Sequence, residues 1–411
     1  MVNELLSTSL SDTCEFYYRD VTGNLLGRTF NAVEIALLGT GVTPVGILRR
    51  SQAMADMAIS GYQGANRVEL NLNPEAELVL DKEDTLVLIS YDEKEVTKAF
   101  ASIAPGKFAG QKPIAIRQHV GQRLPFSKLV IINWNPPMIR DILTEMAKIC
   151  ANLGSGGNRL EVILLNSHTE SDADMQEMNR SISGAIGQPL EGLLSVKCVH
   201  MGESLGLKTL EEAGVTRECA RNTRVLILSE GGANQDSDLQ TLHQLQIIEN
   251  RVSEDIFTAM ELIDSRSQNY FRNTRADVVV SIDSFAEHLM AQAVLKPYIS
   301  LIFRNLLTFS DDTCEFYFRD VPDPYLGRSY AELQKALVGH PIILIGHARP
   351  MNQKGLHPRY TVTLNPKASG QYDDSGRGPR VLRSEKLKKG DRVVLVARVP
   401  EVVDSVLQQI S

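Results

Sequence analysis

The sequence predicts an α/β protein in which a doubly wound parallel sheet is flanked by two homologous, small α+β lobes. The first observation is a repeat, because the segments 12–21 and 312–321 share nine identities in ten residues. The second is a different hydrophobic pattern in the residues between the two copies, where short apolar runs alternate with amphipathic helical segments. Such runs are typical of parallel strands covered by helices on both faces, and right-handed crossovers then give a Rossmann-like fold.

The repeat extends well beyond its first strand. Each copy continues to a Leu-Gly-Arg turn, then to an Asn-Pro turn at Asn73–Pro74 or Asn365–Pro366, and closes on a charged turn and an apolar strand. A repeat of this length indicates a duplicated domain. We therefore expect one lobe over residues 1–100 and its counterpart over residues 304–411.

Local patterns define the elements of the first lobe. Glu15–Asp20 has the aromatic alternation of a strand, and 30–38 carries apolar residues at helical spacing before two glycines end the helix. Short apolar runs predict three further strands, at 42–48, 68–72 and 85–90. The predicted helix is too short to cover the sheet alone, so this lobe is expected to dock on another surface.

Residues 101–126 are rich in glycine and proline, which predicts a linker, and 127–303 form the central Rossmann-like domain. Helices are expected over 138–153 and 236–250, and one long helix over 284–303. Strands of the central sheet are expected at 128–133, 160–165, 195–200, 224–229, 257–262 and 277–281.

Composition excludes several classes of protein. The net charge is −7 and the pI is about 5.7, with no long basic run, so nucleic acid is not an expected partner. The five cysteines form no Cys-x-x-Cys pair, which indicates free thiols in a reducing compartment. No apolar run reaches the roughly 18 to 20 residues that span a bilayer, and no signal peptide is recognised. A cytoplasmic protein is expected.

Ligands of doubly wound sheets bind outside the carboxyl ends of the strands. The residues that the sequence places at those ends are the candidate ligand-binding residues: Trp134, Asn135, Asn166, His168, Gly202, Ser229 and Glu230. The glycine-rich dinucleotide fingerprint is absent, because Asn133–Met138 has no glycine and contains two prolines that lack N–H donors. We favour a degenerate Rossmann lobe over standard NAD binding, with a nucleotide kept as the alternative.

An acidic, glycine-rich loop precedes the predicted 236–250 helix. Asp236 and Asp238 are candidate metal ligands, since calcium sites need several converging carboxylate and carbonyl oxygens. The alternative, which we favour, is that they cap the helix and interact with its dipole. A weaker second candidate is Glu170, Asp172 and Asp174, and neither group matches an EF-hand loop.

The sequence contains little that indicates an enzyme. None of the eight histidines lies in a metalloprotease motif or a recognisable nucleophile frame, and no phosphate-binding P-loop is present. Glu261, Asp264 and Arg266 are expected to form an ion-pair network that fixes the long helix, rather than to bind a ligand. We therefore expect no enzyme, and a divergent NAD(P)-dependent oxidoreductase is the least favoured alternative.

Four stretches carry a resemblance to a known family. Asn133–Trp134 ends the first central strand, 261–266 reads Glu-Leu-Ile-Asp-Ser-Arg, 277–281 is a strand before a long helix, and Cys-Glu-Phe-Tyr opens each lobe. In this order they resemble the RCK (regulator of potassium conductance) modules of ion channels, and most closely those of the CASTOR/POLLUX branch.

The resemblance implies that 1–100 is the C-terminal lobe of a first RCK-like module, whose Rossmann lobe and pore are missing, and that 127–411 is a complete second module. It implies a cytosolic, ligand-sensing gating region at the face of a membrane, with calcium as a candidate ligand. Partners would be a membrane pore domain and further copies of the chain, joined through the 284–303 helix. The alternative is a soluble TrkA-like regulatory subunit of a potassium transporter.

Overall fold

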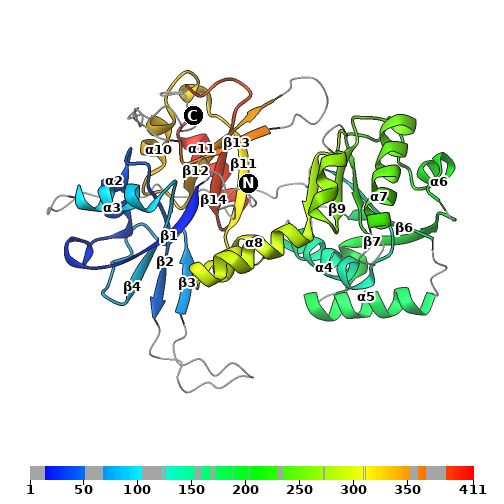
Figure 1. Ribbon diagram of the computed structural model, residues 1–411, viewed down its shortest axis with the longest axis horizontal. Coiled ribbons are helices and arrows are strands. Elements are labelled where there is room, and N and C mark those ends of the chain that lie inside the picture. The colour runs from blue at the N-terminus through cyan, green and yellow to red at the C-terminus, as the bar shows by residue number, and fades with distance from the viewer. Residues whose placement is uncertain are drawn as a thin grey trace, which may run out of the picture. The chain divides into compact units, whose positions relative to one another are not determined.

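The computed structural model (Figure 1) describes residues 14–50, 68–103, 124, 126–152, 159–167, 172–187, 189–202, 204–229, 235–271, 274–308, 310, 312–351, 360–366 and 386–411. The described residues fall into two compact units, with the division inside the helix α8 Ile282–Leu295, between His288 and Leu289. One unit contains both small lobes, and the other contains the parallel sheet.

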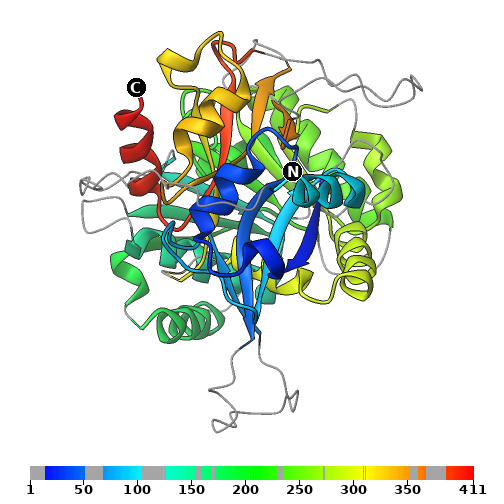
Figure 2. The same cartoon turned by 90° about the vertical axis from the view of Figure 1, so that its left-hand side faces the viewer.

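The first lobe is a four-stranded antiparallel sheet with the order β1-β4-β2-β3. Figure 2 shows this lobe, coloured blue to cyan, facing the viewer. Its helix α2 begins at Thr29, whose side chain accepts a hydrogen bond from the N–H of Ala32. The elements are β1 Glu15–Asp20, η1 Gly23–Leu25, α2 Phe30–Leu37, β2 Thr43–Arg50, β3 Val68–Leu72, β4 Asp84–Ser90 and α3 Glu93–Ala101.

The second lobe repeats this architecture, with the strand order β11-β14-β12-β13. Both sheets have an irregularity before the glycine of their second long strand, Gly46 or Gly346. A Cβ atom on Gly46 would lie 2.6 Å from the Asn71 carbonyl oxygen, so glycine is required there. The elements are β11 Glu315–Asp320, η5 Asp323–Tyr325, α10 Tyr330–Leu337, β12 Ile343–Pro350, β13 Tyr360–Leu364, β14 Arg392–Ala397 and α11 Pro400–Gln409.

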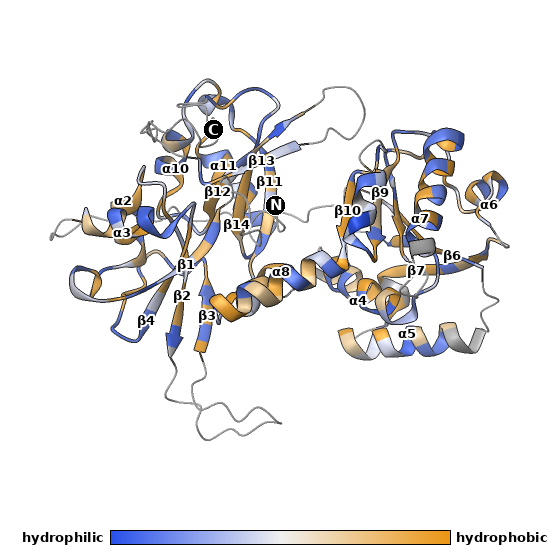
Figure 3. Cartoon of the chain, viewed as in Figure 1, coloured by the Kyte–Doolittle hydropathy of each residue, from blue (hydrophilic) through white to orange (hydrophobic). Residues whose placement is uncertain are grey.

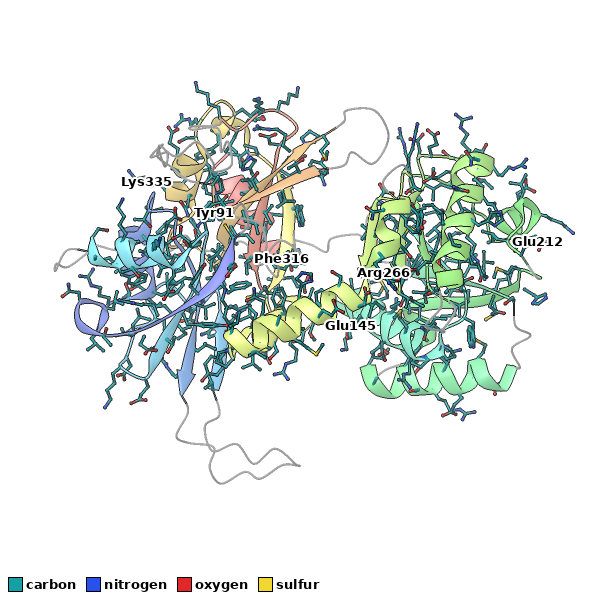
Figure 4. The ribbon with its side chains drawn as sticks, in the orientation of Figure 1. Tyr91, Glu145, Glu212, Arg266, Phe316 and Lys335 are labelled. Atoms are coloured by element: carbon teal, nitrogen blue, oxygen red, sulfur yellow. The ribbon has the colours of Figure 1, made fainter. Side chains whose placement is uncertain are left out.

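The two lobes pack together through reciprocal contacts, and we call this contact the seam. The buried thiol of Cys14 donates to the Leu364 carbonyl oxygen, and that of Cys314 donates to the Leu72 carbonyl oxygen, each over 3.4 Å. The hydroxyl of Tyr91, at the seam (Figure 4), donates to the same Leu364 oxygen. The docking partner expected for the first lobe is therefore its own duplicate.

The second unit is built on a six-stranded parallel sheet with the order β10-β9-β8-β5-β6-β7. The order reverses direction between β5 and β8, as in doubly wound sheets that bind ligands at this point. The elements are β5 Lys128–Ile132, α4 Pro136–Asn152, β6 Leu160–Asn166, α5 Asp172–Ile186, η2 Leu190–Gly192, β7 Leu194–His200, α6 Leu207–Glu212, β8 Thr223–Ile227, α7 Gln235–Ile247, the π-helix η3 Ile248–Val252, β9 Phe257–Leu262, η4 Ser265–Phe271 and β10 Val278–Ser281.

Helices cover both faces of this sheet, whose strands are predominantly hydrophobic (Figure 3). Alternate residues of β5 serve opposite faces: Ile131 packs with α4 and α5, whereas Val130 packs with α6 and α7. This double covering explains the continuous apolar runs in the sequence. The predicted fold class, a doubly wound sheet with two homologous lobes, is confirmed.

One local prediction needs correction, and one helix was missed. The long helix expected over 284–303 is two helices, α8 Ile282–Leu295 and α9 Ile299–Leu307. The interruption lies at Pro297, which has no N–H to donate and whose ring clashes with the preceding turn of a helix. Helix α3, at the end of the first lobe, was not anticipated from the sequence.

Candidate ligand site at the carboxyl edge of the parallel sheet

The first strand of the parallel sheet ends in a left-handed residue. Asn133 follows β5 with a φ of +76°, the conformation for which dinucleotide folds use glycine. Its buried amide is bonded on both sides. Nδ2 donates to the Leu228 carbonyl oxygen over 2.6 Å and to Gln244 Oε1 over 2.9 Å, while Gln244 Nε2 donates back to Oδ1 over 2.7 Å. Asn133 thus ties β5 to α7 and to the end of β8.

The following turn does not fit the pyrophosphate of a dinucleotide, which needs free N–H groups at a helix N-terminus. Pro136 and Pro137 begin α4 and have no N–H. The next two donors are used internally: the N–H of Met138 is 3.4 Å from Asn135 Oδ1, and that of Ile139 donates to the Asn135 carbonyl oxygen. Trp134 is partly buried and packs against the core under α4. The first four residues of α4 therefore offer no free N–H group to a phosphate.

Asn166, at the end of β6, is the predicted residue whose environment most strongly indicates a ligand. The residue is 2% exposed, and within the described part of the chain its side-chain Oδ1 has no hydrogen-bond partner. Its backbone carbonyl accepts from the N–H of Met201, which precedes Gly202 at the end of β7. A buried acceptor without a donor costs about 1 to 3 kcal/mol, and a ligand hydroxyl or amine would remove that cost.

The end of β8 is held by α7 and β9 rather than left open. The N–H of Ser229 donates to Glu261 Oε2 over 2.9 Å, and the Ser229 hydroxyl lies 2.6 Å from that of Ser237. Burial raises the pKa of Glu261, the bond from Ser229 opposes this, and the nearby Asp238 raises the pKa further. Ser229 is therefore held in place by hydrogen bonds to Glu261 and Ser237.

Asp238 stabilises the loop that follows β9. Both of its carboxylate oxygens accept backbone bonds, from the N–H of Ile263 over 2.9 Å and from that of Asp264 over 3.1 Å. Asp236 lies in the first turn of α7, and nothing is described of its side chain. In the residues that the structure describes, no group of three or more His, Cys, Asp or Glu side chains could hold a metal ion.

The expected acidic network beside α8 is present in altered form. Arg266 (Figure 4) pairs with Asp264 over 2.7 Å, but Glu261 bonds to Ser229 and is not part of this ion pair. Asp283 accepts from the N–H groups of Ser265 and Ser284. Although burial opposes it, these bonds and the one from Ser281 lower the pKa of Asp283. Asp283, which was not singled out from the sequence, therefore ties the start of α8 to the loop after β9, and the predicted ion-pair network is reduced to Asp264 and Arg266.

Some predicted positions cannot be placed. His168, Glu230, Glu170 and most of the linker, 104–123, lie outside the described residues. Asp172 and Asp174 lie at the start of α5, and their side chains are not described. The sequence reasoning missed Gln244, although α7 offers a signal, because its buried polar residues Asp238, Thr241 and Gln244 recur at three-residue spacing.

The fold resembles the solved structure of a gating ring. The human SLO3 gating ring matches with a TM-score of 0.58 and 13% identity, over 93% of this chain and 66% of that chain. The GsuK RCK domain matches at 12% identity over 99% of this chain and 70% of that one, and the GsuK channel bound to NAD at 13% over 100% and 57%. Both GsuK matches have TM-scores of 0.26, too low to carry an argument.

No family model matches the chain, and no curated protein matches it. The likeness to the SLO3 gating ring therefore shows the fold, and the predicted RCK-type architecture is confirmed at that level. This chain spans just under two thirds of the SLO3 chain. Among the described residues, no helix combines the length and apolar character needed to cross a membrane.

Proposed function

We propose that this chain is a cytosolic, ligand-sensing gating region of an ion channel of the CASTOR/POLLUX type. The observation that carries the proposal is the match to the human SLO3 gating ring over 93% of the chain. The four sequence stretches that resemble the CASTOR/POLLUX branch support the finer assignment. A ligand that binds one arrangement of such a region more tightly than another shifts the equilibrium between them, and a pore attached to the region would respond.

The proposed ligand binds at the carboxyl edge of the parallel sheet, at Asn166. The unpartnered Oδ1 of Asn166 is an acceptor, so it suits a ligand that presents a hydroxyl or amine, or a cation such as calcium that binds amide oxygens. Calcium and a nucleotide remain the candidates suggested by the sequence, although the α4 turn offers no N–H cradle for a pyrophosphate.

A thermal-shift screen of the chain with calcium, other divalent cations and nucleotides tests this site. A ligand present at 100 times its dissociation constant stabilises the native state by about 2.7 kcal/mol. We expect at least one probe to raise the unfolding temperature of the wild type and not of Asn166→Ala. Asn179→Ala is the matched control, because Asn179 on α5 also has a buried Oδ1 without a described partner. A screen without any shift contradicts ligand sensing by these classes.

The proposed assembly uses α8, which carries an exposed apolar patch. Met290 is 63% exposed, and Val294, four residues further along on the same face of the helix, is 85% exposed; Leu295 beside it is 69% exposed. Such residues are costly to leave in water, and a second copy of the chain would cover them. A gating region needs several copies around one pore.

Light scattering of the chain over a range of concentrations measures this assembly. We expect the wild type to form a dimer or a larger ring, and Val294→Glu to weaken association by about tenfold or more, because it places a charge in the apolar contact. Leu207→Glu on α6 is the matched control, since Leu207 is also an exposed leucine, outside the patch. A wild type that stays monomeric at high concentration would count against a gating region.

A further inference from the structure

The seam between the two lobes contains a partly buried position at which the repeat differs in charge. Glu34 on α2 and Gln334 on α10 occupy equivalent positions in the two copies. Both line one small cavity of about 20 Å³, large enough for a single water molecule. Most of the remaining lining is apolar, including Leu37 from the first lobe and Leu337 and Ile343 from the second. A carboxyl group of one lobe therefore faces the other lobe across an apolar space.

The side-chain amide of Gln334 is hydrogen-bonded to groups of the seam. Gln334 Nε2 donates to the Thr43 hydroxyl over 3.2 Å, and that hydroxyl donates to Asn365 Oδ1 over 2.7 Å. The Asn365 Nδ2 group in turn donates to the Ile89 carbonyl oxygen over 3.1 Å. This chain of bonds crosses between the lobes three times, and every group in it is uncharged.

The carboxyl group of Glu34 is less well stabilised by hydrogen bonds. Burial raises the pKa of Glu34 to about 8, and a hydrogen bond from the backbone N–H of Gly339 only partly offsets this. No other residue described as lining the cavity, whether from β2, α10 or β12, is ionisable. His340 follows Gly339 in the turn after α10, and because burial lowers its pKa it is neutral near pH 7. Lys335, the basic residue of α10, is exposed.

We propose that Glu34 makes the seam a proton-sensitive joint, which is tight when the carboxyl group holds its proton and loosens when the proton is lost. The ionised carboxylate has no cation across the cavity to compensate for its removal from water. Glu34 is only partly buried as a residue, so protons can exchange with solvent. A proton thus acts as a ligand of the closed seam and shifts the population toward it. This joint does not depend on the chain being part of a channel.

The direction of the pH dependence follows from the raised pKa. Between the ordinary value of 4.5 and about 8, the folded protein holds a proton that the unfolded chain has released. The contribution of Glu34 to the free energy of unfolding is therefore largest below pH 4.5. It falls as the pH rises through that interval and becomes constant above pH 8. The interval includes the pH of the cytoplasm, where small changes alter the protonated fraction.

The test is the thermal unfolding midpoint of the full chain between pH 6 and 8.5, for the wild type and for Glu34→Gln. The substitution gives the first lobe the amide that the second already has. We expect the wild type to lose about 5 °C more than the variant over this range, given the slope for one proton and the usual relation between stability and midpoint. Glu77→Gln, an exposed residue of the same lobe, is the control and should behave as the wild type does.

Parallel pH profiles of the wild type and Glu34→Gln would overturn the proposal. If Glu34→Gln does not fold, amide hydrogen exchange of the wild type tests the proposal instead. After correction for the intrinsic pH dependence of exchange, amides of α2 and α10 should lose protection between pH 6 and 8.5, whereas those of β5 and β6 in the parallel sheet should not. Unchanged protection in α2 and α10 would equally reject the joint.

Discussion

The first and second lobes share their internal construction but differ at the seam where they meet. Within each lobe, an arginine of the second long strand pairs with a buried aspartate: Arg49 with Asp84 over 2.7 Å, and Arg349 with Asp391 over 2.6 Å. The strand order and the position of the sheet irregularity also agree. These shared features stabilise each sheet through contacts within its own lobe, so both copies need them equally.

The differences concern side chains that reach across to the other copy. Asn365 donates to the carbonyl oxygens of Gly41 and Ile89 and accepts from Thr43, whereas its counterpart Asn73 makes one described side-chain bond, to the Pro341 carbonyl oxygen. Both asparagines adopt a left-handed backbone. One copy therefore supplies most of the polar contacts at the Asn-Pro turns, which shows that a duplicated fold can form an asymmetric internal interface.

The largest expected effect comes from breaking this asymmetry at Asn365. Asn365→Ala leaves two buried carbonyl groups without their donor and puts alanine in a left-handed conformation, so we expect a loss of about 3 kcal/mol in the free energy of unfolding. Asn73→Ala is the matched control, with one bond lost and an expected cost of about 1.5 kcal/mol. Denaturant unfolding of both variants measures the difference, and equal losses would show that the two turns contribute alike.

Much of this fold could be predicted from the sequence because its signals are local. The apolar run of 160–165 corresponds to β6, and the aromatic alternation of 15–20 corresponds to β1. The repeat itself gave two lobes of one architecture. The break at Pro297 was also visible locally, but the apolar residues on both sides favoured a single helix. Helical periodicity alone was insufficient there, because one missing N–H ends the hydrogen-bond pattern.

The candidate site was less accessible to prediction, since its contacts join distant residues. The side-chain amides of Asn133 and Gln244 form two hydrogen bonds with each other although the residues are 111 positions apart in the sequence. No local pattern predicts such a pair. Asn166 was placed correctly at a strand end, but its unpartnered oxygen depends on what packs around it. Glu34 and Gln334 differ visibly in the repeat, yet the difference acquires meaning only when both are seen to line one cavity.

A smaller effect is expected where the two copies of the Glu-Phe-Tyr strand receive different partners. In the first lobe Glu15 pairs with Lys296, at the turn between α8 and α9, and the Lys296 ammonium also lies 4.7 Å from the centre of the Tyr17 ring. In the second lobe the equivalent Glu315 accepts from the hydroxyl of Tyr317 over 3.3 Å. The turn between the two helices is therefore attached to the first copy.

Lys296→Met tests this attachment, because it removes the charge and keeps a similar aliphatic length. Both side chains of the ion pair are more than four fifths buried, so Glu15 would lose its compensating charge in a poorly solvated position. We expect a loss of about 1 to 2 kcal/mol in the free energy of unfolding, measured by denaturant titration. Lys335→Met, on the exposed side of α10 (Figure 4), is the control and should change stability by less than about 0.5 kcal/mol. If the two variants lose the same amount, the ion pair contributes nothing, and the turn after α8 is held by the packing of α9 residues such as Phe303, whose ring lies 5.8 Å from that of Phe16.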